Sequence, residues 1–242
     1  MDDAVKQVLD GLSGLEAIEL SHPLEERMPA FPSHPMYFKM RWQPPGEPAV
    51  LHQIILCDHS GTHVDAPCHF PTRPDSVDKT IEKWEPLHLV GHAVCVRVDP
   101  VERPDALITA DDVKAWEQDN LPIAAGDIVL LDNGWAAKWA VGDDAAAYTD
   151  GWPGVDHSFV DYVVERGIRA IGTDSISIDT ADGVGGEFPG HLTFLPEGIA
   201  IFENLTNLSR LPAEFVFMAL PLPLKGASGS PVRAVALVPR SE

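Results

Sequence analysis

Residues 59–70 read HSGTHVDAPCHF, and this stretch holds three histidines and one carboxylate within eleven residues. His59, His63, Asp65 and His69 follow one another at spacings of 4, 2 and 4, which is typical of a metal site. A strand rises about 3.3 Å per residue, so a straight strand would hold His59 and His63 too far apart to share one ion. A helix would bring these two histidines together but would turn Asp65 away from them.

We therefore predict a turn within this stretch. Gly61 allows the backbone to bend where the first two imidazoles need to converge, and Pro67 prevents the segment from continuing as a helix. Cys68 lies inside the stretch, and we interpret it as a small spacer, the alternatives being a nucleophile or a metal ligand.

The composition limits the class of protein. The 242 residues are 45% hydrophobic and 22% charged, as in ordinary globular proteins, but 17 basic residues against 37 acidic ones give a net charge of -20. Such a charge repels phosphate backbones and anionic lipid surfaces, so we expect neither nucleic acid nor a membrane as a partner. The amino terminus lacks the pattern of a secretory signal, and no apolar run approaches the roughly 18 residues of a membrane span. Three cysteines without a CxxC pair indicate reduced thiols in a cytoplasm.

The hydrophobic patterns predict a single α/β domain over residues 1–242, with a mixed β-sheet flanked by helices. A helix is expected after the cap Thr109 and another over about 156–166, ended by Gly167. The strand at 52–58 is expected to deliver the histidine stretch. The predicted strands are 15–20, 52–58, 92–98, 127–132, 168–174, 198–203, 214–220 and 231–238.

Residues 21–48 differ in character, with seven prolines and several aromatic residues. This composition excludes one regular helix or strand throughout, and a long irregular segment is often functional. We interpret it as a flap that lines a pocket or reaches a neighbouring subunit, with ordinary surface packing as the alternative. Phe31, Trp42 and Trp84 could face a flat substrate, although core packing would explain aromatic residues equally well.

Two residues far along the chain are also candidates. His191 follows the glycine-rich loop 182–190, and Glu203 ends the apolar strand predicted at 198–203. A carboxylate in that position is costly if it is buried without a partner, so a nearby cation would explain it. A turn or helix-cap role for Glu203 is the alternative.

The stretch 59–70 resembles the signature of the cyclase-like metal-dependent hydrolases, which include bacterial kynurenine formamidases and isatin hydrolases. The resemblance extends through residues 173–175 (TDS), 203–208 (ENLTNL) and 230–234 (SPVRA). It implies a swivelling β/α/β type of fold, and it implies a proton-transfer role for His69. It also implies five metal ligands: His59, His63, Asp65, His191 and Glu203.

Imidazole and carboxylate ligands without a thiolate favour Zn²⁺ or Mn²⁺. Five protein ligands exceed the needs of one tetrahedral ion, and two ions could share Asp65 as a bridge. Such a site lowers the pKa of bound water towards about 7 and polarises an amide carbonyl, so only the leaving nitrogen still needs a proton, which His69 could supply. A structural metal site is the alternative. Asp174, Asp179 and Glu187 could each orient a ligand imidazole, although a turn or surface role is the preferred interpretation of each.

These observations predict a homo-oligomer, a dimer or tetramer, that hydrolyses the carbon–nitrogen bond of a small aryl or cyclic amide with one or two metal ions. N-formylkynurenine is the leading substrate candidate, and isatin or another cyclic amide is the alternative. A non-catalytic protein that binds a metal or a small molecule on the same fold is the alternative from another class.

Overall fold

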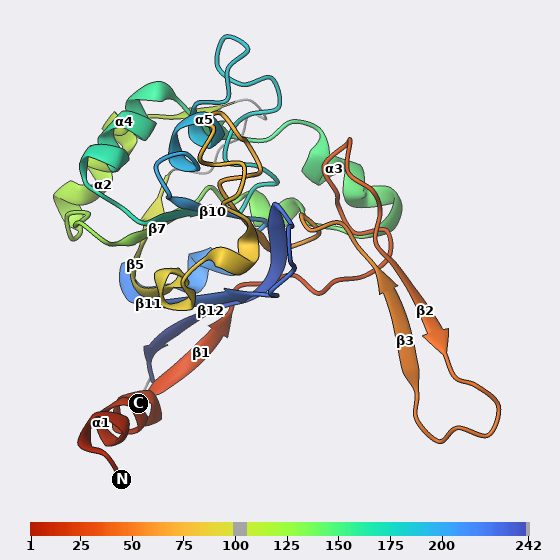
Figure 1. Ribbon diagram of the computed structural model, residues 1–242. Helices are drawn as coiled ribbons and strands as arrows, with labels where there is room; N and C mark the ends of the chain where they lie inside the picture. Colours follow the sequence, from red (N-terminus) through yellow and green to blue (C-terminus); the bar gives the residue numbers. More distant parts are fainter. Residues whose placement is uncertain (99–105, 241–242) are drawn as a thin grey trace.

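The computed structural model describes residues 1–98 and 106–240, and eight of its described strands form one large mixed sheet (Figure 1). The pairs β5–β7, β7–β9 and β9–β10 are parallel, and the other pairs are antiparallel. β12 pairs with β11 and also with β4, which closes the sheet into a barrel. In sheet order the strands are β1 Leu15–Glu19, β12 Gly229–Pro239, β11 Glu214–Pro221, β5 Val90–Arg97, β7 Ile128–Asp132, β9 Ala170–Thr173, β10 Ala200–Glu203 and β4 His63–Asp65.

Two cores lie on opposite faces of this sheet. In β7, Ile128 and Leu130 belong to the core inside the barrel, and Val129 and Leu131 belong to the core under the helices. Because successive side chains of a strand point to opposite faces, a strand buried on both sides is apolar throughout. The uninterrupted apolar run of β7 follows from its place between the two cores.

Helices cover the outer face of the parallel strands, as Figure 1 shows. They are α2 Ala110–Asp119, α4 His157–Glu165 and α5 Pro189–Phe194. Thr109 and Asp112 form a capping box at the start of α2, and Asp156 accepts a hydrogen bond from the Phe159 amide at the start of α4. The predicted single α/β domain with a mixed sheet flanked by helices is confirmed. The closure of the sheet into a barrel was not predicted from the sequence.

The smaller elements surround this body. No helix in the described ranges has the length and apolar composition needed to cross a bilayer. The remaining helices are α1 Asp3–Ser13 and α3 Ala146–Thr149, with 3-10 turns at Ile81–Lys83, Pro86–Leu89, Trp135–Lys138, Gly142–Ala145 and Leu208–Arg210. Two short strands, β6 Leu107–Ile108 and β8 Gly154–Val155, pair in parallel.

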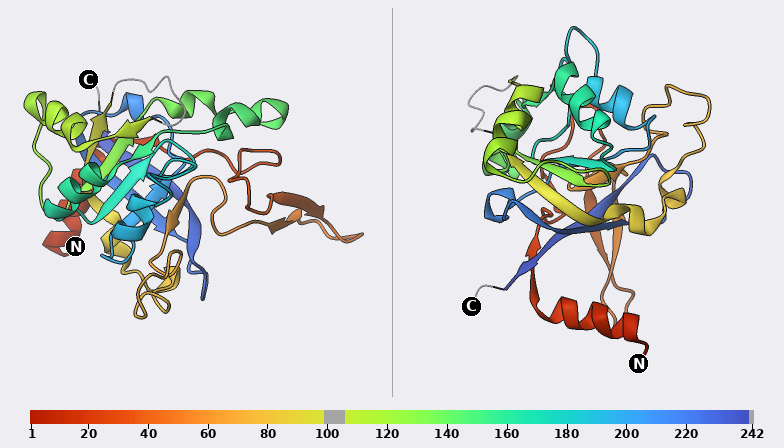
Figure 2. Two further views of the ribbon diagram at one scale, coloured as in Figure 1. Left: turned by 90° about the horizontal axis from the view of Figure 1, so that it is seen from above. Right: turned by 90° about the vertical axis from the view of Figure 1, so that its left-hand side faces the viewer.

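The strand predicted at 52–58 was expected to deliver the histidine stretch, but it lies outside the large sheet. It forms β3 Leu51–Ile55, which pairs with β2 Phe38–Trp42 in a hairpin that projects from the barrel (Figures 1 and 2). The histidine stretch is instead carried into the barrel by β4. The prediction failed because the apolar residues of β3 resemble a core strand, whereas every residue of β2 and β3 is exposed.

Candidate metal centre

The predicted turn at Gly61 is present. Gly61 has a φ of +61°, which favours glycine, and a Cβ built there would lie 2.5 Å from Leu24 Cδ2. The chain then enters β4, in which His63 and Asp65 point to one face and Val64 points into the barrel core. β4 pairs with two strands, so that His63 lies opposite Glu203. The turn and the pairing together bring the two halves of the site into contact.

His191 reaches the same place from α5. The Asp179 carboxylate accepts hydrogen bonds from the backbone amides of Gly190 (2.7 Å) and His191 (3.0 Å) at the start of this helix. It also accepts one from the ring Nδ1 of His191 at 2.6 Å. Glu203 is fixed in turn by the Ile178 amide, which donates to Oε1 at 2.9 Å. Asp179 therefore orients a ligand candidate, whereas the sequence favoured a turn or surface role for it.

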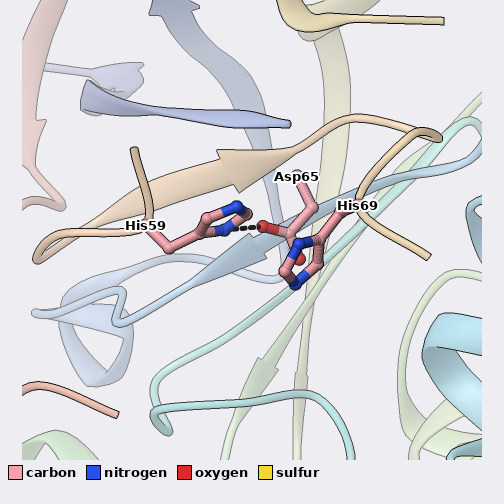
Figure 3. A group of neighbouring side chains, drawn as sticks. All are labelled: His59, Asp65 and His69. Atoms are coloured by element: carbon pink, nitrogen blue, oxygen red, sulfur yellow. Dashed lines mark ion pairs between the residues drawn. The ribbon is translucent and has the colours of Figure 1, made fainter. Parts of the chain in front are cut away.

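The five predicted ligands converge on one point and are all buried. Asp65 Oδ1 lies 2.7 Å from His59 Nδ1 and 3.4 Å from His63 Nε2, and Asp65 Oδ2 lies 3.4 Å from His191 Nε2. Glu203 is 3.4 Å from His63 Nε2 and 3.5 Å from His191 Nε2. Figure 3 shows His59 and His69 on either side of Asp65. Two carboxylates thus face three imidazoles.

The surroundings of the Asp65 side chain indicate that the five clustered residues suit a cation. Its side chain has no exposure to solvent, and neither of its oxygens has a hydrogen-bond partner in the described part of the chain. The 2.7 Å contact with His59 does not have the geometry of a hydrogen bond, and His59 Nδ1 is also without such a partner there. Burying an unpartnered carboxylate is costly unless a cation compensates it. The donor set of nitrogen and oxygen atoms fits a divalent ion such as Zn²⁺ or Mn²⁺.

Without a cation, only protons on the histidines can compensate the negative charges of Asp65 and Glu203. The pKa values of the site reflect this balance. Burial would raise the pKa of Asp65, but the surrounding histidines hold it well below its usual range. Burial would lower the pKa of His63, but Asp65 and Glu203 raise it to about 10. Burial opposes ionisation of His191 too, and Asp179 and Asp65 nevertheless raise its pKa well above the usual value. A bound cation would replace these protons.

A cavity of about 300 Å³ opens beside these side chains and gives a substrate access to them. His69 lines it, with its ring centroid 4.0 Å from that of His59 and 5.8 Å from that of His191. Burial lowers the pKa of His69 to about 4, so its imidazole is neutral near pH 7. Phe31, Phe70 and Phe188 also line the cavity and give it flat apolar walls.

The remaining residues that the sequence raised as candidates do not belong to this cluster of ligand candidates. Trp42 is 55% exposed on β2 and does not line the cavity of its own chain, because β2 belongs to the projecting hairpin. Trp84 lines a different cavity. Asp174 accepts hydrogen bonds from backbone amides, and the side chain of Glu187 is 68% exposed, so neither orients a ligand imidazole. Cys68 packs against the barrel core, in keeping with a spacer.

The sequence did not single out His34, which lines the cavity from the proline-rich segment. Its Nδ1 is buried without a hydrogen-bond partner among the described residues, and its ring centroid lies 5.7 Å from that of His59. A lone histidine in an irregular segment carries no spacing signal, so only the fold reveals its position.

Comparisons with known proteins agree with this geometry. The isatin hydrolase of Roseibium aggregatum is 32% identical over 78% of this chain and 74% of its own length. The kynurenine formamidase of Geobacillus thermodenitrificans is 28% identical over 90% of this chain and 95% of its own. The structure of isatin hydrolase A from Ralstonia solanacearum superimposes with a TM-score of 0.87 at 27% identity, covering 98% of each chain. The sequence model of the Cyclase family matches residues 18–180, and the chain therefore belongs to the Cyclase family.

Proposed function

We propose that this enzyme hydrolyses the carbon–nitrogen bond of a small aryl or cyclic amide, with one or two divalent cations held by His59, His63, Asp65, His191 and Glu203. The observation that carries the proposal is the fully buried Asp65 carboxylate, which faces three imidazoles and has no hydrogen-bond donor among the residues that the structure describes. When bound, Zn²⁺ or Mn²⁺ would lower the pKa of a water molecule and polarise the amide carbonyl.

A shared role for Asp65 is supported by the way its oxygens are divided. Oδ1 faces His59 and His63, whereas Oδ2 faces His191. Asp65 also belongs to two separate groups of close ligand atoms, one with His59 and His69 and one with His63 and Glu203. Two cations, one near His59 and one near His63 and Glu203, would both have the Asp65 carboxylate within reach.

His69 is the proposed proton-transfer residue. In the described part of the chain its ring makes no hydrogen bond, while its position in the cavity lets it reach a bound substrate. A neutral imidazole can accept a proton from the attacking water and then donate it to the leaving nitrogen. The proximity of His69 to His59 and Asp65 also allows a ligand role, which the variant below distinguishes.

The substrate proposal rests on the shape of the cavity and on the relatives. Three phenylalanines line a space of about 300 Å³, which suits one flat aromatic ring system. N-formylkynurenine is the leading candidate because kynurenine formamidases match nine-tenths of the chain. Isatin is the second candidate because a relative named isatin hydrolase is 32% identical.

The test combines His69→Ala with a panel of N-formylkynurenine, isatin and simple aryl and cyclic amides. We expect wild type to cleave at least one of them, and His69→Ala to lose about 10²- to 10⁴-fold in kcat while retaining its metal content. His157→Ala removes an exposed histidine and is the matched control. Full activity of His69→Ala would contradict its catalytic role, and loss of metal would assign it to the ligands. A metal-loaded wild type that binds but cleaves none of these amides would contradict the proposed reaction.

The proposal includes a homo-oligomer formed through the hairpin of β2 and β3. Phe38, Met40, Trp42, Leu51 and Ile55 share one face of this hairpin and are all more than half exposed. A two-stranded hairpin is marginally stable alone, so its apolar face is expected to be covered. The other face presents two cations, which suit a second copy of this acidic chain. The free thiols of Cys57, Cys68 and Cys95 further support a cytoplasmic location.

Met40→Glu tests this interface because it places a charge on the apolar face of the hairpin. We expect light scattering after size-exclusion chromatography to give a dimer or larger for wild type and a monomer for the variant. Val77→Glu changes an equally exposed apolar residue away from the hairpin and is expected to leave the assembly intact. A monomeric wild type, or an unchanged assembly of Met40→Glu, would contradict the proposed interface.

A further inference from the structure

Ser228, the residue that precedes β12, contacts His59 on the side of its ring that faces away from Asp65. Ser228 Oγ lies 2.9 Å from His59 Nε2. The same hydroxyl donates to Asp58 Oδ2 at 3.0 Å, and the Ser228 backbone amide donates to this oxygen at 3.0 Å as well. Asp58 Oδ2 itself is 3.8 Å from His59 Nε2, which is beyond direct hydrogen-bond distance. The Ser228 hydroxyl therefore links the carboxylate to the imidazole.

The direction of these hydrogen bonds decides which nitrogen of His59 carries a proton. An ionised carboxylate only accepts, so the Ser228 hydroxyl donates to Asp58. The hydroxyl oxygen is then left to accept from Nε2–H of His59. The proton on Nε2 leaves Nδ1 with a free lone pair, and Nδ1 is the atom that lies 2.7 Å from Asp65 Oδ1. This tautomer is the one that a metal ligand requires.

The other two ligand imidazoles are held in an equivalent way. His63 Nδ1 donates to the Gly61 carbonyl at 2.8 Å, and His191 Nδ1 donates to Asp179 at 2.6 Å. In both residues the remaining nitrogen, Nε2, faces the carboxylates of the site. The Ser228 hydroxyl, which is bonded to Asp58, is the hydrogen-bond acceptor for His59. The Gly61 carbonyl has this role for His63, and the Asp179 carboxylate has it for His191.

The backbone of β12 adds a steric constraint on the same ring. A Cβ built on Gly229 would lie 2.6 Å from His59 Cε1 and 3.0 Å from His59 Nδ1. The ring therefore packs directly against the strand, where only glycine leaves room. Ser228 is fixed there because its carbonyl accepts from the Ala66 amide at 2.8 Å, next to the pairing of Gly229 with Asp65.

We propose that Ser228 and Asp58 are positioning residues that fix the tautomer and the orientation of His59 for metal binding. The inference rests on the proposed role of His59 as a ligand. It assigns a function to the carboxy-terminal serine-glycine segment, which lies 169 residues from His59 in the sequence and touches it only through the closure of the barrel.

The experiment measures the dissociation constant for Zn²⁺ alone by competition with a chromogenic chelator at fixed pH. Loss of a group that orients a ligand histidine typically weakens metal binding by about 10- to 100-fold, and we expect this loss for Ser228→Ala and for Asp58→Ala. Because the two residues act in series, the double variant should lose no more than the stronger single variant. Ser228→Thr keeps the hydroxyl and should restore affinity relative to Ser228→Ala.

Ser230→Ala is the matched control for a purely structural role. Ser230 is buried two residues further along, in β12, where it accepts from the Leu222 amide and donates to the Pro231 carbonyl; among the described residues it makes no hydrogen bond with His59. Its replacement is expected to lower the unfolding temperature without changing the affinity for Zn²⁺. Thermal unfolding of every variant verifies that the fold is retained.

His59→Ala separates failure of the inference from failure of the proposed function. If His59→Ala binds Zn²⁺ weakly while Ser228→Ala and Asp58→Ala bind it like wild type, the metal site stands and the positioning role is overturned. If His59→Ala itself binds like wild type, His59 is not a ligand and the inference falls with that assignment. Additive losses from the two single variants would also contradict a linked pair.

Discussion

Replacing Gly229 with alanine tests whether β12 determines the position of His59. The added Cβ would lie 2.6 Å from His59 Cε1 and 2.9 Å from the Val64 carbonyl oxygen, both closer than real Cβ contacts. The Val64 carbonyl belongs to the paired strand β4, and the imidazole would have to move by about 0.8 Å to reach an ordinary contact of 3.4 Å. Metal–ligand distances tolerate about 0.2 Å, so this displacement removes His59 from the site.

We therefore expect Gly229→Ala to bind Zn²⁺ at least about 10-fold more weakly than wild type, as measured by chelator competition. Crowding of this buried position should also lower the free energy of unfolding of the metal-free protein by about 1–3 kcal/mol. Gly14→Ala is the control, because a Cβ there has no neighbour closer than 3.7 Å. If Gly229→Ala kept wild-type affinity and stability, the close packing of the ring against the strand would be refuted.

Two further predictions concern charge. Asp65→Ala removes the carboxylate shared by the two groups of ligands and should abolish stoichiometric metal in elemental analysis, so an undiminished metal content would exclude a bridging role. The pKa of His92 is raised by the hydrogen bonds that its ring donates to Asp127 and Glu214. The stability that these bonds contribute is therefore complete below the unfolded pKa of about 6.5 and is lost as the pH rises through the raised folded value. Because the side chain is 49% exposed, we expect His92→Gln to cost less than about 1 kcal/mol at pH 6 and still less at pH 9, and a cost that grew with pH would contradict this sign.

Much of the site was accessible from the sequence because its ligands leave local signals. The stretch 59–70 carries its own spacing, and Glu203 ends an apolar strand where a carboxylate needs a reason to be buried. The resemblance to a known family then implied the same set of five ligands. The structure places these five residues around a single buried centre.

The remaining features depend on contacts that leave no periodic pattern. β4 has only three residues, too few for its alternation to be recognised, yet its pairing with β10 and β12 closes the barrel. Ser228 acquires its contact with His59 only through this closure. The hairpin strand β3 was misplaced for the opposite reason, because its exposed apolar residues have the same pattern as those of a core strand.

β4 also links the stability of the fold to metal binding. His63 and Asp65 point from one of its faces to the site, while Val64 points from the other into the barrel core, so the pairing that completes the core also assembles the ligands. The unfolded chain lacks this pairing, so residues 59–65 are separated from His191 and Glu203, which lie more than a hundred residues away in the sequence. A cation that binds only the folded chain at 100 times its dissociation constant adds about 2.7 kcal/mol to the free energy of unfolding. Metal removal should therefore weaken first the contacts of β4, the strand on which both the barrel and the proposed chemistry depend.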